Sequence, residues 1–202
     1  NILTQEDLKS FIQEVHETGM LSIDTETNTL KAFDARLVGI SLACKIGYAY
    51  YIPILHINND AIKQLKLELI MSLLNPLLSD KSIIKIGQNI KYDLIVLKKN
   101  GFNFIYPCDD TMLMSYTLSA GLHNHNLDFL AKFYLDHQMI KYKDIVGTGK
   151  KEINFSEVDI EIAKNYACED ADITLRLWHE LKKKLIQKRL IRVYENIEKP
   201  LI

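Results

Sequence analysis

The sequence predicts an α/β fold, in which helices flank a sheet, and three observations support this. Strand-like segments follow one another over residues 21–27, 37–44 and 49–55, with the short links that are typical of an antiparallel meander. Most of the remaining chain repeats apolar residues at helical spacing. The chain has 202 residues, 48% of them hydrophobic, which is enough for one domain with a well-buried core.

The first helix is predicted just before the strand over 21–27. Thr4 is a suitable N-cap because its hydroxyl can accept a backbone N–H, and acidic residues follow in the first turn. Gly19 is expected to end this helix, since glycine readily adopts the left-handed conformation found after helix C-termini. Gly47 is expected to form the turn between the second and third strands.

The middle of the chain alternates predicted helices with one short apolar strand. A long amphipathic helix is predicted over 61–78, interrupted near Pro76, and a short strand follows over 83–86. Further helices are predicted, in chain order, over residues 89–99, 111–118, 127–135 and about 159–188.

Two later segments lack a simple pattern. Residues 141–151 are polar and contain two glycines, so we interpret them as an exposed loop. Residues 193–202 restart a helical pattern that has no stop signal, so the natural polypeptide is expected to continue.

Composition excludes several classes of function. The net charge is -1, so any nucleic-acid phosphates must be bound locally rather than by a broad basic surface. No apolar run reaches the roughly 20 residues that a membrane span needs. The three scattered cysteines, Cys44, Cys108 and Cys168, fit neither a disulfide framework nor a zinc site. We therefore expect a cytoplasmic protein without a membrane partner.

Two carboxylates share one face of the strand over 21–27. Side chains alternate along a strand, so Asp24 and Glu26 point to the same side. Neighbouring carboxylates repel one another, and a divalent cation such as Mg²⁺ or Mn²⁺ removes that repulsion. A polar strand face that contacts only water is the alternative.

A third carboxylate lies where the short strand over 83–86 gives way to a helix. Asn89 and Asp93 are four residues apart, so they project together from one face of that helix. Open sheets place their sites at such junctions. The alternative is a capping asparagine and a solvated aspartate.

The fourth carboxylate interrupts an apolar stripe on the long final helix. Asp170 follows the same helical spacing as its apolar neighbours, and a buried unpaired carboxylate is costly. Tyr166 precedes it by one turn on the same side. Glu169 and Asp172 fall off the stripe, which predicts ordinary surface charges. Alternatively, a lysine or a helix N-terminus pairs with Asp170, and Tyr166 is core packing.

Asp24, Glu26, Asp93 and Asp170 thus come from three separate elements. Four carboxylates around one point can hold two divalent ions roughly 3.5–4 Å apart, which suits in-line displacement at phosphorus. Tyr166 can supply a hydroxyl that orients the attacking water.

These residues carry a family resemblance. Three motifs, in order, are Asp24-Thr25-Glu26, Asn89-x-Lys91-Tyr92-Asp93 and Tyr166-x-x-x-Asp170. They resemble the exonuclease motifs of the DEDD superfamily, in its tyrosine-bearing branch. The chain is most similar to the proofreading 3′→5′ exonuclease domain of bacterial DNA polymerase I, the small domain of the Klenow fragment. Further similar segments are Gly87-Gln88-Asn89, Asp110-Thr111-Met112-Leu113, Tyr166 to Asp172, and Glu195 to Leu201.

The resemblance implies an RNase H-like fold with a mixed five-stranded sheet flanked by helices. It implies two divalent metal ions, Mg²⁺ or Mn²⁺, with Asp24 bridging both. Glu26 and Asp170 would complete the tighter site, and Asp93 would hold the second ion through water. Tyr166 and Glu26 would orient the attacking water.

The resemblance also implies residues that bind the terminal nucleotide. Leu30 matches a position that wedges against the terminal base, and Tyr142 matches an aromatic residue that stacks on it. Further positions near the nucleotide are Thr25, Gln88, Asn89 and Tyr92.

One departure from the family lies in the segment 121–125. Some members carry an arginine where this chain has Leu122, so one phosphate contact is expected to be missing. His123 and His125 are candidates to replace it, or else they are exposed polar residues. The segment 147–151 resembles a family loop near the strand, and a flexible solvated turn is the alternative.

The resemblance implies hydrolysis of the 3′-terminal phosphodiester of DNA, with release of nucleoside 5′-monophosphates. The expected partners are a single-stranded or frayed 3′ end and a polymerase domain in the same natural polypeptide, and we expect a bacterial, monomeric protein. Residues 1–190 would form the exonuclease domain, and 191–202 would begin the polymerase domain. The alternatives are an exoribonuclease of the RNase D kind and a catalytically silent scaffold.

Overall fold

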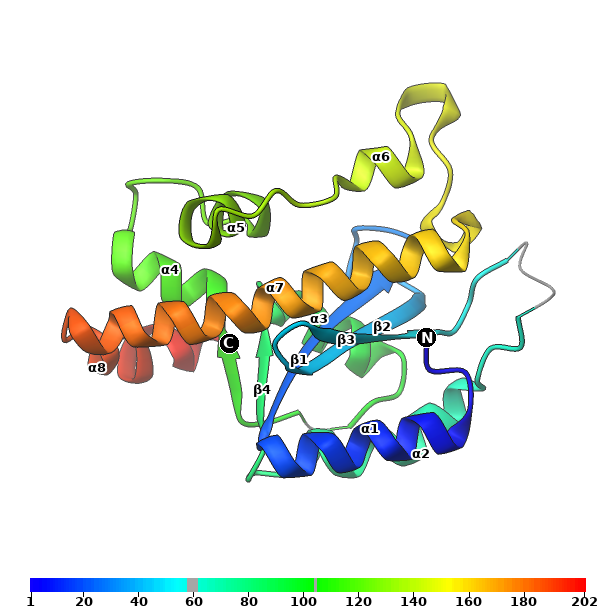
Figure 1. Ribbon diagram of the computed structural model, residues 1–202, viewed down its shortest axis with the longest axis horizontal. Coiled ribbons are helices and arrows are strands. Elements are labelled where there is room, and N and C mark those ends of the chain that lie inside the picture. Colours follow the sequence, from blue (N-terminus) through cyan, green and yellow to red (C-terminus); the bar gives the residue numbers. More distant parts are fainter. Residues whose placement is uncertain (58–61, 104) are drawn as a thin grey trace.

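The computed structural model describes residues 1–57, 62–103 and 105–202. A five-stranded sheet in the order β3-β2-β1-β4-β5 forms its centre (Figure 1). The strands are β1 (Met20–Thr27), β2 (Leu37–Lys45), β3 (Tyr48–Pro53), β4 (Ile84–Gly87) and β5 (Cys108–Asp110). The antiparallel meander is confirmed, because β1 pairs with β2 and β2 with β3 in that sense. The parallel pairs β1–β4 and β4–β5 make the sheet mixed, as expected.

Most of the helices agree with the predicted segments, and α2 and α6 are the exceptions. They are α1 (Gln5–Thr18), α2 (Leu67–Ser79), α3 (Ile90–Lys99), α4 (Thr111–Ser119), α5 (Leu127–Leu135), α6 (Tyr142–Val146), α7 (Ile160–Gln187) and α8 (Ile191–Val193). Thr4 caps α1 by accepting the Asp7 backbone N–H at 3.1 Å, as predicted. Gly19 ends α1 in the left-handed region at φ 69°.

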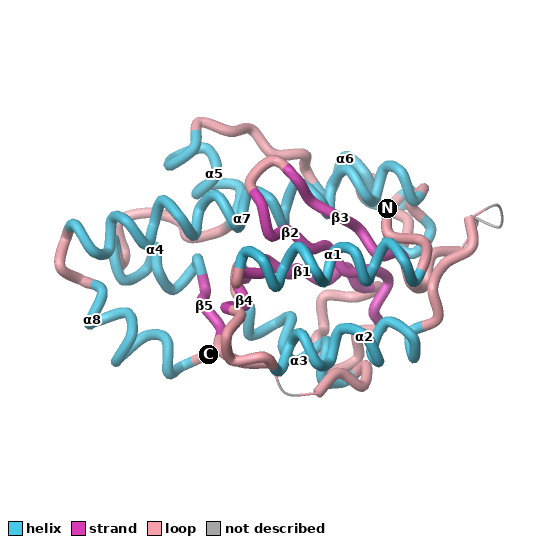
Figure 2. Tube along the Cα trace, turned by 60° about the horizontal axis from the view of Figure 1, so that its bottom comes forward, coloured by secondary structure: helices cyan, strands magenta, loops and turns pink. Residues whose placement is uncertain are grey.

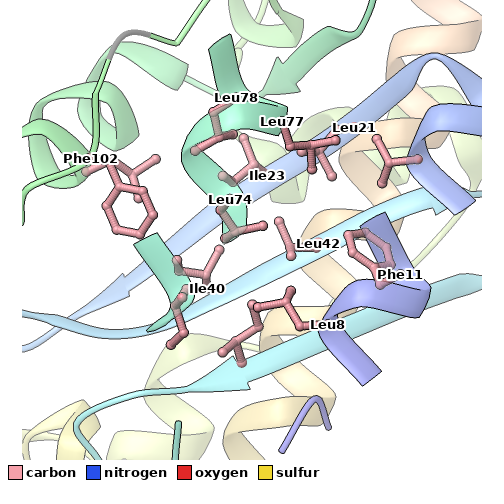
Figure 3. Close-up of a cluster of buried hydrophobic side chains, with 14 of the residues drawn as sticks. Leu8, Phe11, Leu21, Ile23, Ile40, Leu42, Leu74, Leu77, Leu78 and Phe102 are labelled. Atoms are coloured by element: carbon pink, nitrogen blue, oxygen red, sulfur yellow. The ribbon is translucent and has the colours of Figure 1, made fainter. Parts of the chain in front are cut away.

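Helices cover both faces of the sheet (Figures 1 and 2). One face packs against α1, α2 and α3, and Figure 3 shows the apolar side chains that meet there. Those labelled include Leu8 and Phe11 from α1, Leu21 and Ile23 from β1, and Leu74 from α2. The other face packs against α7, which crosses β1, β2 and β3 and carries α4 and α5 on its outer side. β1 therefore lies at the centre of the sheet with helices on either side.

The helix predicted over 61–78 differs from the structure in its start and in the interruption expected near Pro76. Residue 61 lies outside the described residues, and the helix begins only at Leu67, after an extended Lys66 that gives no side-chain cap. Pro76 does not interrupt it, and α2 continues to Ser79. A proline removes a single helical hydrogen bond. Burial of Leu74 and Leu77 against the sheet compensates for that loss.

The predicted loop over 141–151 is also partly wrong. It contains α6 (Tyr142–Val146) and a short 3-10 turn (Gly149–Lys151). Val146 anchors α6 because it is buried in a small core with Phe155 and Ala163. The apolar residues of α6 are too few to produce a helical stripe in the sequence.

The last segment packs against the rest of the fold. After α8 it continues as a π-helical turn (Tyr194–Glu198) and a 3-10 turn (Lys199–Leu201). Tyr194 is fully buried in one core with residues of α4, α5 and α7. Its hydroxyl donates to Asp109 at 3.2 Å and accepts the Asp110 backbone N–H at 2.9 Å. The domain boundary after residue 190 stays a prediction.

Two expectations from composition can be compared with the structure. Within the described part of the chain, no helix is both long and apolar enough to cross a lipid bilayer. All three cysteines are free thiols.

Candidate functional site

β1 and α7 bring three carboxylates together. Asp24 and Glu26 come from β1 and Asp170 from α7, and one oxygen of each lies within 4.8 Å of the others. Glu26 is only 6% exposed and Asp170 8% exposed, while Asp24 is partly buried. The predicted convergence of a strand face and a helix stripe is therefore present in the structure.

Small residues allow the two elements to approach. Ala163 and Ala167 are fully buried on the face of α7 that also carries Asp170. On the neighbouring strand, Gly39 pairs with Glu26. A methyl group on Gly39 would lie 2.0 Å from the Tyr51 hydroxyl, so only glycine fits. The packing of β2 beside Glu26 thus depends on the close contact between Gly39 and Tyr51.

Asp93 lies beside these three carboxylates but makes different contacts. It is buried on α3, and its Oδ1 accepts the Thr25 backbone N–H at 3.0 Å and the Thr25 hydroxyl at 2.6 Å. It is not part of the three-carboxylate cluster, although it lines the same pocket of about 290 Å³. Thr25 therefore orients Asp93 next to Asp24.

Burial and mutual repulsion disfavour the charged forms of these groups. Burial raises the pKa of Asp24 to about 7. Burial also raises the pKa of Glu26 well above its ordinary value, and the charges of Asp24, Asp170 and Asp93 add to this. The pKa values of Asp93 and Asp170 are raised by burial first and by Asp24 second. All four groups would ionise more easily beside a cation.

The donor set fits a divalent cation. Glu26 Oε1 is buried, and no described residue gives it a hydrogen bond. Carboxylate oxygens are the ligands that Mg²⁺ and Mn²⁺ prefer. A cation in contact with Asp24, Glu26 and Asp170 would satisfy that oxygen and relieve the repulsion among the three groups.

The raised pKa of Asp24 predicts how stability depends on pH. The folded value of about 7 exceeds the ordinary 3.8, so the metal-free fold binds more protons than the unfolded chain between these values. The protonated Asp24 therefore contributes to the free energy of unfolding. This contribution is complete below about pH 4 and is lost as pH rises through 7. We expect the Tm of the metal-free protein to fall over this range. Mg²⁺ should restore it at high pH, because cations bind the ionised form.

Thermal unfolding in EDTA and in MgCl₂ across this pH range measures the effect. Asp24→Asn should weaken the pH dependence, since it removes one of the four carboxylates whose pKa is raised. A Tm in EDTA that rises with pH, or one that MgCl₂ leaves unchanged at pH 8, would contradict the expectation.

Tyr166 forms a wall of the pocket one turn before Asp170. Burial first, and then the charge of Asp170, raise the pKa of its phenol, so it stays protonated at neutral pH. Its ring contacts Tyr142 and Phe155 at centroid distances of 6.0 and 6.2 Å. These contacts fix the ring, and the hydroxyl can donate a hydrogen bond.

The other predicted binding residues lie around the same pocket. Leu30 is 86% exposed and Tyr142 is 41% exposed, and both line the pocket. The Tyr92 hydroxyl hydrogen-bonds to Thr27 Oγ1 at 2.9 Å and to the Thr29 carbonyl at 3.1 Å. Besides the carboxylates and Tyr166, the lining residues are Thr25, Thr27, Thr29, Leu30, Gln88, Asn89, Tyr92 and Tyr142. Thr27 and Thr29 were not foreseen, although they follow the Asp24 motif directly.

The segments 121–125 and 147–151 do not line this pocket among the described residues. Leu122 is 81% exposed. His125 Nδ1 lies 2.8 Å from Ser115 Oγ, and the His123 ring stacks on Phe129 at 5.0 Å. The structure therefore gives both histidines packing contacts, and replacement of the missing phosphate contact stays a prediction.

The expectation that Glu169 and Asp172 are ordinary surface charges is wrong. Glu169 accepts hydrogen bonds from His137 Nε2 at 2.8 Å and the Ile140 N–H at 2.7 Å. Asp172 accepts the Gly47 N–H at 2.7 Å and pairs with Arg176. Both carboxylates tie loops to α7.

Comparison with known proteins places this geometry in a family. The sequence profile of the DNA polymerase A exonuclease family, described as 3′–5′ exonuclease, matches residues 1–186. The chain belongs to this family. DNA polymerase I of Rhizobium leguminosarum is 41% identical over 213 residues, which cover 96% of this chain and 21% of that protein.

Two further DNA polymerases I are similar to this chain to about the same degree. DNA polymerase I of Pseudomonas aeruginosa is 38% identical and covers 100% of this chain and 22% of that protein. DNA polymerase I of Borreliella burgdorferi is 39% identical, and the match covers 99% of this chain and 21% of that protein. The chain thus spans about a fifth of the length of these curated relatives.

Solved structures confirm the RNase H-like exonuclease fold. Brucella melitensis NrnC superposes with a TM-score of 0.72 at 24% identity, over 92% of this chain and 82% of that one. Escherichia coli RNase D superposes with a TM-score of 0.65 at 18% identity, over 95% of this chain and 48% of that one. The catalytic core of RRP6 from Trypanosoma brucei superposes with a TM-score of 0.74 at 17% identity, over 99% of this chain and 50% of that one.

Proposed function

We propose that this domain is a two-metal-ion 3′→5′ exonuclease that removes single nucleotides from the 3′ end of DNA, as in proofreading. The observation that carries this is the cluster of Asp24, Glu26 and Asp170, whose oxygens lie within 4.8 Å, with Asp93 in the same pocket. Family membership supports it, because the relatives at 38–41% identity are DNA polymerases I. A structure of the distant relative NrnC contains bound Mg²⁺.

Each carboxylate then has a role that follows from its position. Asp24 belongs to the cluster with Glu26 and Asp170, and its charge also acts on Asp93, so it would contribute to both cation sites. Glu26 and Asp170 would complete the first site. Asp93, already held by Thr25, would face the second through water. When bound, such ions supply an activated water and neutralise the leaving oxygen.

The remaining residues orient the reactants. The Tyr166 hydroxyl stays protonated and lies beside Asp170, so it can donate to the phosphate or hold the attacking water. Glu26 would contact the ion through Oε1 and can accept a hydrogen bond from that water through its other carboxylate oxygen. Hydrolysis adds water across the terminal P–O bond and leaves a 5′-monophosphate and a shortened 3′-hydroxyl end.

The residues at the pocket mouth support the proposed preference for a free 3′ end. Leu30 is exposed at the pocket mouth and Tyr142 presents a partly exposed ring, so the terminal base can lie between an aliphatic and an aromatic surface. Base stacking of this kind contributes roughly 1–3 kcal/mol. A base must leave its pair to lie between Leu30 and Tyr142 in this pocket of about 290 Å³, so we expect duplex termini to fray first.

The competing functions differ in substrate or in activity. An exoribonuclease of the RNase D kind would share the carboxylates, but the curated relatives at 38–41% identity favour DNA. A silent scaffold is disfavoured because all four carboxylates line the pocket. The fusion to a polymerase domain that begins at residue 191 is part of this proposal.

Digestion of 3′-labelled oligonucleotides tests the function directly. We expect labelled 5′-monophosphate from single-stranded DNA with Mg²⁺ and none with excess EDTA, because the carboxylates act through the ions. Mismatched duplex ends should be degraded faster than matched blunt ends. Undiminished degradation in EDTA would refute the two-metal site, and faster digestion of a matched RNA would favour the RNase D alternative.

A further inference from the structure

Asp110, at the end of β5, holds the starts of two helices. Its buried carboxylate accepts backbone N–H groups from Met112 at 2.8 Å and Leu113 at 3.3 Å, which caps α4. The same carboxylate accepts the N–H groups of Asn89 at 3.1 Å and Ile90 at 3.0 Å, at the start of α3. A carboxylate at a helix N-terminus is favourable because the first N–H groups are otherwise unpaired.

The Asn89 backbone depends on this contact. Asn89 adopts the left-handed region at φ 55° and ψ 45°, which an L-residue rarely occupies unless neighbours hold it there. Its own side chain makes no capping hydrogen bond, and it lines the site pocket. The alternative in which the Asn89 side chain caps α3 is therefore wrong: Asp110 accepts the N–H groups there, and Asn89 lines the pocket.

Thr111 makes a similar contact with Gln88, the residue before Asn89. Its hydroxyl lies 2.5 Å from Gln88 Oε1 and 3.1 Å from the Gly87 carbonyl. The other end of the Gln88 amide, Nε2, donates to the His125 carbonyl at 2.7 Å. The direction of the Gln88 side chain along the pocket wall is thus set by two contacts.

We propose that Asp110 and Thr111 are positioning residues that fix Gln88 and Asn89 for the terminal nucleotide, an inference that rests on the proposed exonuclease function. β5 gives this pair a fixed base, because it pairs with β4 and the Asp110 N–H is bonded to Tyr194. Gln88 and Asn89 follow β4 directly, so two adjacent strands set two adjacent binding residues. Asp93, one turn into α3, has its register set by the same helix start.

Two substitutions separate positioning from stability. Asp110→Asn can keep the oxygen that accepts the N–H groups of Asn89, Met112 and Leu113, and it replaces the other oxygen with an NH₂ donor. That donor cannot accept the Ile90 N–H, so the start of α3 loses one of its two contacts. Thr111→Val keeps the side-chain shape and removes only the hydroxyl, so it tests the proposal even where Asp110→Asn folds poorly. Thr4→Ala is the matched control, because it removes the N-cap of α1, a helix without pocket residues.

The readouts are kcat, KM and the affinity for a fluorescein-labelled single-stranded DNA with a phosphorothioate 3′ linkage. Asp110→Asn should lower kcat/KM by about 10-fold, and Thr111→Val should raise KM by about 3-fold, with kcat almost unchanged, since lost hydrogen bonds of this kind have such effects. Thr4→Ala should lower Tm and leave both kinetic constants unchanged.

Double-mutant cycles decide whether the pair acts through its neighbours. If Asp110 acts through Asn89, Asp110→Asn should cost little in a protein that already carries Asn89→Ala, and the same should hold for Thr111→Val with Gln88→Ala. Fully additive losses in affinity, or KM changes no larger than those of Thr4→Ala, overturn the proposal. The affinity cycle remains decisive if the wild-type domain binds DNA without cleaving it, a result that would refute only the proposed function.

Discussion

Asp24→Ala is expected to abolish DNA hydrolysis, with a loss of at least about 1000-fold in kcat, because in the proposed site this one residue contributes to both cation positions. Asp24 lies within 4.8 Å of Glu26 and Asp170 and also interacts with Asp93. Its removal leaves neither site complete. The fold should survive, since the substitution also removes a buried charge that burial disfavours.

Single-turnover cleavage with Mg²⁺, together with calorimetric titration of Mg²⁺, measures this effect. Asp34→Ala is a matched control, because Asp34 is an exposed aspartate outside the pocket. We expect the control to keep wild-type activity and metal affinity. Near wild-type cleavage by Asp24→Ala would remove Asp24 from the proposed site.

Tyr166→Phe is expected to lower kcat by roughly 10- to 1000-fold while metal affinity stays unchanged, because one positioned hydroxyl typically contributes a few kcal/mol. The ring contacts with Tyr142 and Phe155 remain in the variant, so Tm should hardly change. Asp24, Glu26 and Asp170 are also intact, which preserves the cation ligands.

Asp170→Ala provides the contrast, since it should weaken metal binding and cleavage together. Paired calorimetric titration and single-turnover cleavage distinguish the two variants. Wild-type cleavage by Tyr166→Phe would show that Tyr166 is only a packing residue.

The parts of the site that the sequence predicts are those with a local signal. Alternation along β1 places Asp24 and Glu26 on one face, and the apolar stripe of α7 turns Asp170 inward, so their meeting follows once the helix covers the sheet. The resemblance implies that Leu30 wedges against the terminal base, which stays a prediction; in the structure Leu30 is exposed and lines the pocket.

The features that were missed depend on contacts between distant residues. β5 has three residues, two of them aspartates, and it is a strand only because β4 offers a partner edge. Asp110 reaches back 21 and 20 residues to the N–H groups of Asn89 and Ile90. Glu169 likewise contacts His137, 32 residues away. No local pattern of hydrophobicity or spacing reports such partners.

Tyr194 ties the last segment of the chain to the edge of the sheet. Its phenol is bonded to both aspartates at the end of β5, an edge strand that pairs only with β4 among the described residues. Tension applied to the chain beyond Tyr194 would therefore reach this edge strand directly. Short edge strands open with less free energy than central ones. Such a load would loosen the starts of α3 and α4 while the buried centre of the sheet, with Asp24, stayed in place.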